Sequence, residues 1–182
     1  MESQMIDTFI KRLQFEFEEG SVQVKILKDI EGLLEREFKL TAKKGQEKNV
    51  PLWIATELIK QGYAKLKENF IELSELHNVL KKEGEAHALQ PIDKDFYLKV
   101  REQLKFLKQI EIESPTAQQS YEKIEALIRD ILSMRLFKVL KIASQTRNSR
   151  DFTEYMTKEE KILFQELSSL CIQWKDKLFS LD

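Results

Sequence analysis

Two histidines and one cysteine are the residues on which metal binding or nucleophilic catalysis in this chain would depend. Two histidines are too few for a site that relies mainly on imidazole ligands. A di-iron helical bundle requires a glutamate three residues before each metal-binding histidine. Ser74 and Gly84 occupy those positions before His77 and His87. We therefore assign no metal and expect a protein that is not an enzyme.

Glu83 and His87 lie one helical turn apart and form the strongest remaining pair of reactive residues. Such a pair is compatible with a metal site or a bundle enzyme, but we favour a solvated polar pair. Cys171 falls on an apolar stripe, which favours an inert buried thiol over a nucleophile. The sequence has no glycine-rich phosphate loop, so we expect no cofactor.

Basic residues gather between positions 129 and 150, where they form a candidate anion-binding surface. They are Arg129, Arg135, Lys138, Lys141, Arg147 and Arg150. We favour a solvated helix face with ion pairs, or a contact between subunits, over direct binding of nucleic acid. The alternative is a DNA-contacting helical adaptor, with Arg147 and Arg150 as weak candidate contacts. Its affinity would fall steeply with salt.

Arg135 differs from these neighbours because it lies between Met134 and Leu136 in a strongly apolar run. The planar fork of a guanidinium group suits a carboxylate or backbone carbonyl oxygens. We therefore expect Arg135 to have a fixed partner and a structural role, within a helical bundle or across an interface.

The bulk composition is that of a folded protein. At 182 residues, the chain can bury about 70% of its unfolded surface. Its formal net charge of -1 creates no global attraction to nucleic acid or anionic membranes. The single cysteine excludes an internal disulfide, and the N-terminus has no signal-like apolar run. We expect a soluble intracellular protein, cytoplasmic or nucleoid-associated.

The glycines divide the chain into two parts. All five lie between Gly20 and Gly84, and the remainder up to Asp182 has none. Because glycine marks turns and is rare inside helices, the first part should contain short mixed elements and the second long helices. We predict a mainly α protein with a small N-terminal α/β module, residues 1–68, followed by a helical-bundle domain, residues 69–182.

The small module should combine short strands with one buried helix. Proline suits a helix start and glycine a helix end, so we predict a helix from Val50-Pro51 to Gly62. Most of its surface is apolar, and we favour Trp53 as a core aromatic over an exposed partner anchor. The other predicted elements are a helix at the N-terminus, strands over 22–26, 38–42 and 63–66, and a loop over 43–49.

Four helices are predicted in the second part, which favours a four-helix bundle. One covers 69–82, one follows the capping residue Asp93, and the longest begins at Ser114-Pro115. Thr157 to Glu160 fits a capping box at the start of the last. On the long helix we expect a buried stripe with Tyr121, Ile128 and Leu132, whose surplus apolar surface would favour association with other subunits.

Three segments carry a family resemblance. Val50 to Ala55 reads VPLWIA within a small α/β module, and Leu89 to Tyr97 resembles a Leu-Pro-x-x-φ-Tyr helix start. Asp130, Arg135 and Lys138 fit an Asp-x(4)-Arg-x(2)-Lys pattern in the long helix. Together these segments resemble the GINS replication complex, over roughly residues 20 to 170. The order of the two parts is similar to the second and third eukaryotic partner-of-Sld-five subunits, which many archaea replace by one protein.

This resemblance implies a role and a set of partners. A GINS subunit of this class is expected to be a non-catalytic scaffold in a heterotetramer with subunits of the opposite domain order. The resemblance also implies contacts with the minichromosome maintenance helicase and a RecJ-like partner at the replication fork. Arg135 and Lys138 would then have interface or structural roles, together with Trp53 and the stripe of the long helix.

Overall fold

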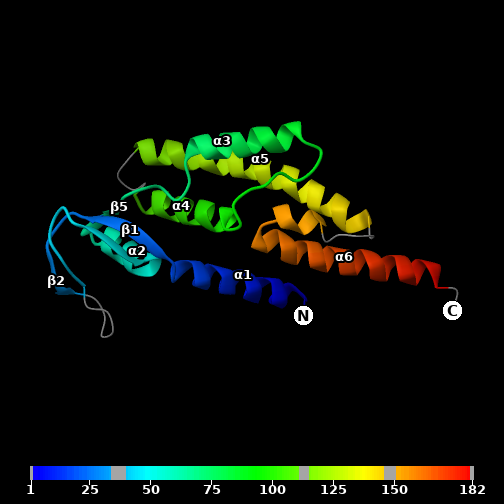
Figure 1. Cartoon of the computed structure of the whole chain (residues 1–182), viewed down its shortest axis with the longest axis horizontal. Coiled ribbons are helices and arrows are strands. Elements are labelled where there is room, and N and C mark those ends of the chain that lie inside the picture. The colour runs from blue at the N-terminus through cyan, green and yellow to red at the C-terminus, as the bar shows by residue number, and fades with distance from the viewer. Residues whose placement is uncertain (1, 34–39, 111–114, 146–150, 181–182) are drawn as a thin grey trace. The chain divides into compact units, whose positions relative to one another are not determined.

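The computed structural model describes residues 2–33, 40–110, 115–145 and 151–180. The chain divides into two compact units, residues 1–70 and 71–182, which we describe separately. The first unit contains the sheets and the second is a helical bundle (Figure 1). This arrangement confirms the predicted fold class, a mainly α protein with a small α/β module before a bundle.

The first unit is built on a long antiparallel hairpin. Strand β1 (Ser21–Ile26) pairs with β4 (Glu47–Pro51). Farther along the same two chain segments, β2 (Ile30–Leu33) pairs with β3 (Leu40–Ala42). Strand β5 pairs with the other edge of β1, giving the order β4-β1-β5. The elements are α1 (Glu2–Glu18), β1 (Ser21–Ile26), β2 (Ile30–Leu33), β3 (Leu40–Ala42), β4 (Glu47–Pro51), α2 (Leu52–Lys60) and β5 (Ala64–Leu66).

Most of these elements match the sequence-based predictions, with two corrections. The N-terminal helix, β1 and β5 are confirmed. The predicted loop over 43–49 is wrong at its end, because Glu47, Lys48 and Asn49 belong to β4. Their side chains have low strand propensity, but the backbone pairing with β1 outweighs it. Strand β2 was not predicted.

Helix α2 covers one face of the three-stranded sheet. It begins after Pro51, which is the last residue of β4, and Gly62 follows its end with φ +71°. Its buried residues pack with the inward-facing residues of the strands, and the shared core cluster contains Val24, Ile26, Ile30, Leu40, Ala42, Val50, Ile54, Ala55, Leu58 and Ala64. Trp53 is 39% exposed, so the preferred interpretation of this residue as a core aromatic is wrong.

The second unit contains four α-helices and a short 3-10 helix. They are α3 (Leu73–Glu85), α4 (Phe96–Ile110), α5 (Pro115–Gln145), η2 (Asp151–Tyr155) and α6 (Lys158–Phe179). The predicted helix over 69–82 lies three to four residues later in the structure. Helix α5 is central, because α3, α4 and α6 all pack against it.

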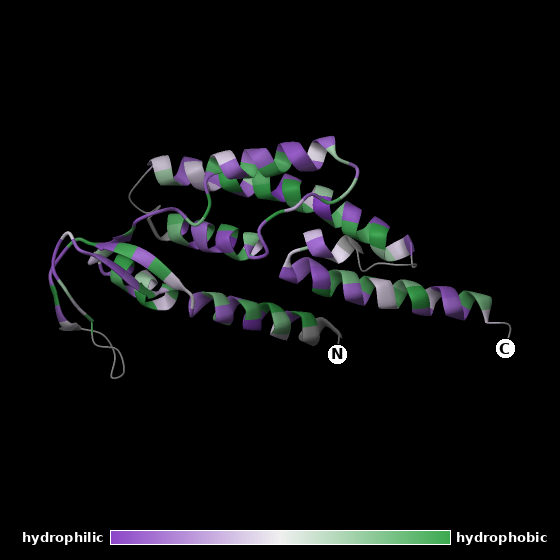
Figure 2. Ribbon diagram, viewed as in Figure 1, coloured by the Kyte–Doolittle hydropathy of each residue, from purple (hydrophilic) through white to green (hydrophobic). Residues whose placement is uncertain are grey.

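Two apolar clusters form the core of the bundle. The first joins α3, α4 and the first half of α5 through Leu76, Phe96, Val100, Ile124, Ile128 and Ile131, together with Ile71. The second joins the last part of α5 to Leu89, Met156 and Phe164 through Val139 and Ala143. Hydrophobic and hydrophilic segments alternate along α5 and α6, as expected for helices with one buried face (Figure 2). None of the helices in the described ranges could cross a lipid bilayer.

Candidate functional site

Arg135 lies on α5 between the two apolar clusters and is fully buried. Its guanidinium group binds the carboxylate of Glu160 through two bonds, from Nε to Oε1 at 2.7 Å and from Nη2 to Oε2 at 2.8 Å. Nη1 donates to the Glu83 carboxylate and to the Gln90 carbonyl, and Nη2 donates to the Tyr155 carbonyl. All five N–H groups of the guanidinium therefore have an acceptor.

Lys138 extends this network by one turn of α5. Its Nζ donates to the Glu83 carboxylate, to the Glu83 carbonyl at 2.8 Å and to the Ala88 carbonyl at 3.0 Å. The backbone N–H of Gln90 donates to Glu83 Oε1 at 3.0 Å. The end of α3 and the segment that follows it are thus attached to the middle of α5.

Glu160 connects the network to α4 and to the start of α6. Its Oε1 accepts a hydrogen bond from the Tyr97 hydroxyl at 2.7 Å, and its Oε2 accepts one from the Thr157 backbone N–H at 3.0 Å. The Thr157 hydroxyl oxygen accepts the Glu160 N–H at 3.2 Å. The predicted capping box is confirmed. The sequence did not indicate that its glutamate would also bind Arg135 and Tyr97.

Two cations and two carboxylates make this network formally neutral. Burial lowers the pKa of Arg135, but the hydrogen bond and charge of Glu160, with the charge of Glu83, more than offset that effect and raise the pKa above its usual value. Burial, followed by the neighbouring Glu160 charge, raises the pKa of Tyr97. The guanidinium therefore stays charged and the phenol neutral at physiological pH. Such groups can position helices, and they do not exchange protons near neutrality.

Glu83 and His87, which we had interpreted as a solvated polar pair, lie in different surroundings in the structure. Glu83 is buried and bound to Arg135 and Lys138, whereas His87 is exposed. The interpretation of the two residues as a solvated pair is therefore wrong for Glu83. Among the residues that the structure describes, no group of three or more His, Cys, Asp or Glu side chains is placed to hold a metal ion.

The basic residues that the structure describes between positions 129 and 145 do not form one cationic face. Arg129 binds Glu125 at 2.8 Å on the surface of α5. Arg135 and Lys138 point into the buried network, where their charges are neutralised. Arg147 and Arg150 lie outside the described residues. Two of the cations that a phosphate-binding surface would need are thus unavailable.

Helix α5 exposes an apolar stripe beside its buried one. The buried residues follow Ile124, Ile128, Ile131, Arg135 and Val139. The large exposed residues are Leu132, Met134, Leu136, Phe137 and Leu140, and Phe137 is 70% exposed. Tyr121 is half-buried. Leu132 is 46% exposed, so its assignment to the buried stripe was wrong.

The second half of α6 exposes a similar stripe. Leu170, Trp174 and Leu178 recur every four residues, and Trp174 is 61% exposed. Ile172 and Phe179 are also exposed. Cys171 is half-buried, not fully buried as expected. We call the exposed apolar residues of α5 and α6 together the apolar surface of the bundle.

Comparison with known proteins assigns the chain to a family. The family model described as Sld5, GINS complex protein helical bundle domain, matches residues 37–179. This span contains all four helices of the bundle and begins before β3. No match was found among curated proteins. Because the family model covers most of the chain and includes the network and the apolar surface, this protein belongs to the GINS complex family.

Proposed function

We propose that this chain is a non-catalytic scaffold subunit of a GINS complex that links the replicative minichromosome maintenance helicase to a RecJ-like partner at the replication fork. Family membership gives the coarser part of this statement: GINS proteins are structural components of a DNA replication complex, and other GINS subunits are their partners. The links to the helicase and to the RecJ-like protein are our proposal.

The apolar surface of the bundle is the observation that best supports a scaffold role. Five large apolar residues of α5 and five of α6 are exposed in the single chain. Leu132, Leu136 and Leu140 recur every four residues along one face of α5, as Leu170, Trp174 and Leu178 do along α6, and exposed apolar faces of this kind mark interaction sites. Permanent interfaces resemble a protein core divided between subunits, with leucines and aromatic residues at the centre. The surface is suited to helices of another subunit.

The finer assignment concerns the class of subunit. We infer the class in which the small domain precedes the helical domain, as in the single archaeal protein that replaces two eukaryotic subunits. Residues 1–68 would be the small B-type domain and residues 69–182 the helical A-type domain. Subunits of the opposite domain order would complete a heterotetramer. The position of the sheet-containing unit before the bundle supports this class.

The alternative, a DNA-contacting adaptor that uses residues 129–150, has less support. Arg135 and Lys138 form ion pairs with buried carboxylates, and Arg129 forms one with Glu125. A scaffold needs the apolar surface, whereas a DNA adaptor would leave it unexplained.

The mass in solution of the chain, alone and with a co-expressed subunit of the opposite domain order, tests the proposal. We expect a stable hetero-oligomer with two copies of each chain, and apolar residues of α5 and α6 protected from hydrogen exchange in it. A chain that remains monomeric with every such subunit would overturn the scaffold assignment. Binding to the helicase and to the RecJ-like protein is then measured with the purified complex.

A further inference from the structure

The three-stranded sheet has one face that α2 does not cover. Successive residues of a strand point to opposite faces. Val24 and Ile26 are buried with α2, whereas Gln23 and Lys25 are exposed on the opposite face. The neighbouring strands add exposed Lys65 from β5 and Glu47 from β4 to this face. The open face is therefore polar and contains several lysines.

Two of these lysines face each other directly. Lys25 pairs in register with Lys65, which places their Cβ atoms about 5 Å apart. Like charges directly opposite one another destabilise a sheet. Lys67 reaches Glu47 at 2.8 Å, so the nearest carboxylate is already used. Neither Lys25 nor Lys65 has an ion pair within the described part of the chain.

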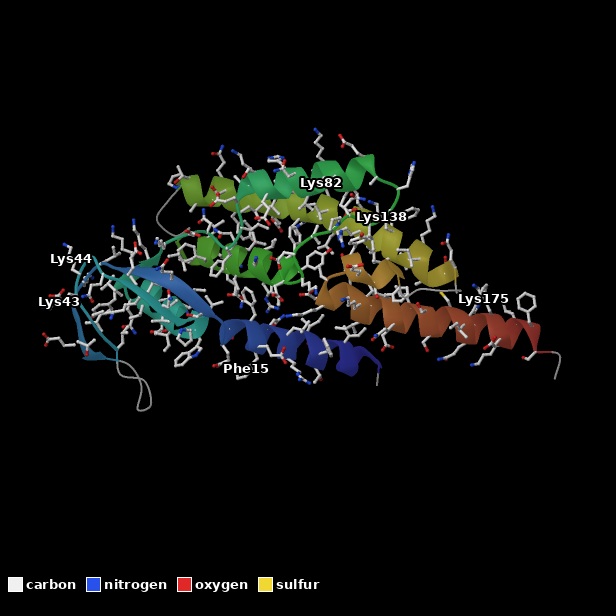
Figure 3. All side chains as sticks on the ribbon, viewed as in Figure 1. Phe15, Lys43, Lys44, Lys82, Lys138 and Lys175 are labelled. Carbon is white, nitrogen blue, oxygen red and sulfur yellow. The ribbon has the colours of Figure 1, made fainter. Side chains whose placement is uncertain are left out.

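Two further lysines lie beyond the three-stranded sheet, where the backbone N–H of Lys44 donates to Asp29 Oδ1 at 2.7 Å. Lys43 and Lys44 are exposed in the turn between β3 and β4, where the long hairpin bends (Figure 3). Lys28 Nζ lies 5.6 Å from the centre of the Tyr63 ring. Residues 20–68 carry nine lysines and one arginine against seven acidic residues, although the whole chain has a net charge of -1. Residues 1–19 carry five acidic and two basic residues, so the small unit as a whole is neutral and its positive charge lies in the part that contains the sheets.

We propose that this lysine surface, comprising Lys25, Lys43, Lys44 and Lys65, binds the phosphate backbone of single-stranded nucleic acid. Cations on one face lie about 7 Å apart along a strand and about 5 Å apart across strands. A polymer with one negative charge in every repeating unit can neutralise several of them at once and relieve their repulsion. Lysine contacts phosphate as a point charge, so the binding would not depend on base sequence.

Nucleic acid fits this surface better than an acidic protein segment does. The lysine surface is open, and the buried apolar residues of the sheet all face α2. An acidic protein segment would need an apolar anchor to bind with useful affinity. A phosphate backbone needs only cations, and the exposed lysines supply them. This function goes beyond the proposed scaffold role and does not depend on it.

The test uses fluorescence anisotropy of a labelled oligothymidylate of about 20 nucleotides, longer than the sites that such surfaces occupy. The full chain is titrated at several salt concentrations. Each phosphate contact on a single strand contributes about 0.7 to the slope of log affinity against log salt. We expect Lys25→Gln with Lys65→Gln to reduce that slope by about 1.4 and to weaken binding at low salt.

The matched control is Lys108→Gln with Lys123→Gln, which removes the same charge from exposed positions on α4 and α5. We expect the control to keep the slope of the unmodified chain. The proposal is overturned if the unmodified chain does not bind, if the two double variants lose equal slope, or if polyglutamate binds more tightly than the oligonucleotide. Circular dichroism verifies that both variants are folded, as expected for substitutions at exposed positions.

Discussion

At the residue scale, Arg135 is costly to desolvate, and its burial is compensated by hydrogen-bond acceptors. Glu83, Glu160 and two backbone carbonyls take all of its N–H groups. Replacing a whole buried ion network by apolar residues is often neutral or stabilising, whereas removing one member leaves an uncompensated charge. We therefore expect the network to contribute more to the specific arrangement of the helices than to net stability.

Arg135→Met should lower the free energy of unfolding by about 3–5 kcal/mol, because Glu83 and Glu160 would stay buried without their main cation. The matched control is Arg129→Met on the same helix, which removes an exposed ion pair and should leave the free energy of unfolding nearly unchanged. Urea unfolding followed by circular dichroism measures both. Equal losses in the two variants would contradict the network. Adding Glu83→Gln and Glu160→Gln to Arg135→Met should recover part of the loss.

Tyr97 should make stability depend on alkaline pH. Its pKa is raised in the folded protein, so the phenol stays neutral there while the unfolded chain ionises above about pH 10. The contribution of Tyr97 is therefore complete below pH 10 and decreases as the pH rises further. Tyr97→Phe should flatten the decline of melting temperature above pH 10. An equally steep decline in the Tyr97→Phe variant would contradict this prediction.

At the scale of single elements, local signals in the sequence were sufficient to predict where several helices begin or end. Pro51 and Gly62 delimit α2, and the Thr157 capping box starts α6, because these effects act within one turn of chain. The partners of Arg135 could not be predicted, since Glu83 and Glu160 are 52 and 25 residues away in sequence. Helical spacing locates an apolar stripe, but it does not tell whether the same chain covers that stripe.

Thr157→Ala should destabilise the bundle by about 1–2 kcal/mol. The hydroxyl caps the N–H of Glu160, and that carboxylate must also remain aligned with Arg135 and Tyr97. Ser133→Ala is a suitable control, because its exposed hydroxyl only donates to the Arg129 carbonyl within α5. Chemical unfolding of both variants measures the difference. A Thr157 variant as stable as the control would show that the cap has no part in holding the network.

For the whole molecule, the exposed position of Leu132 changes what its substitution should do. Leu132→Asp should leave the single chain folded, because the side chain is already 46% exposed. In a complex it would bury an unpaired charge, so we expect the dissociation constant for the companion subunit to rise at least about 100-fold. Light scattering and melting curves of the co-expressed complex measure this effect. Gln119→Asp, an exposed polar position on the same helix, should have no such effect.

The central place of β1 in the sheet has a consequence for how the protein can be shortened. The family match starts at residue 37, but the strand that joins β4 to β5 spans Ser21–Ile26. A truncation to the matched segment would remove β1, so that β4 and β5 would have no strand between them to pair with. The apolar side of α2 would also lose its contacts with Val24 and Ile26. Such a fragment would expose that side of α2 and aggregate, so residues upstream of the recognisable family segment must be retained in any expressed version.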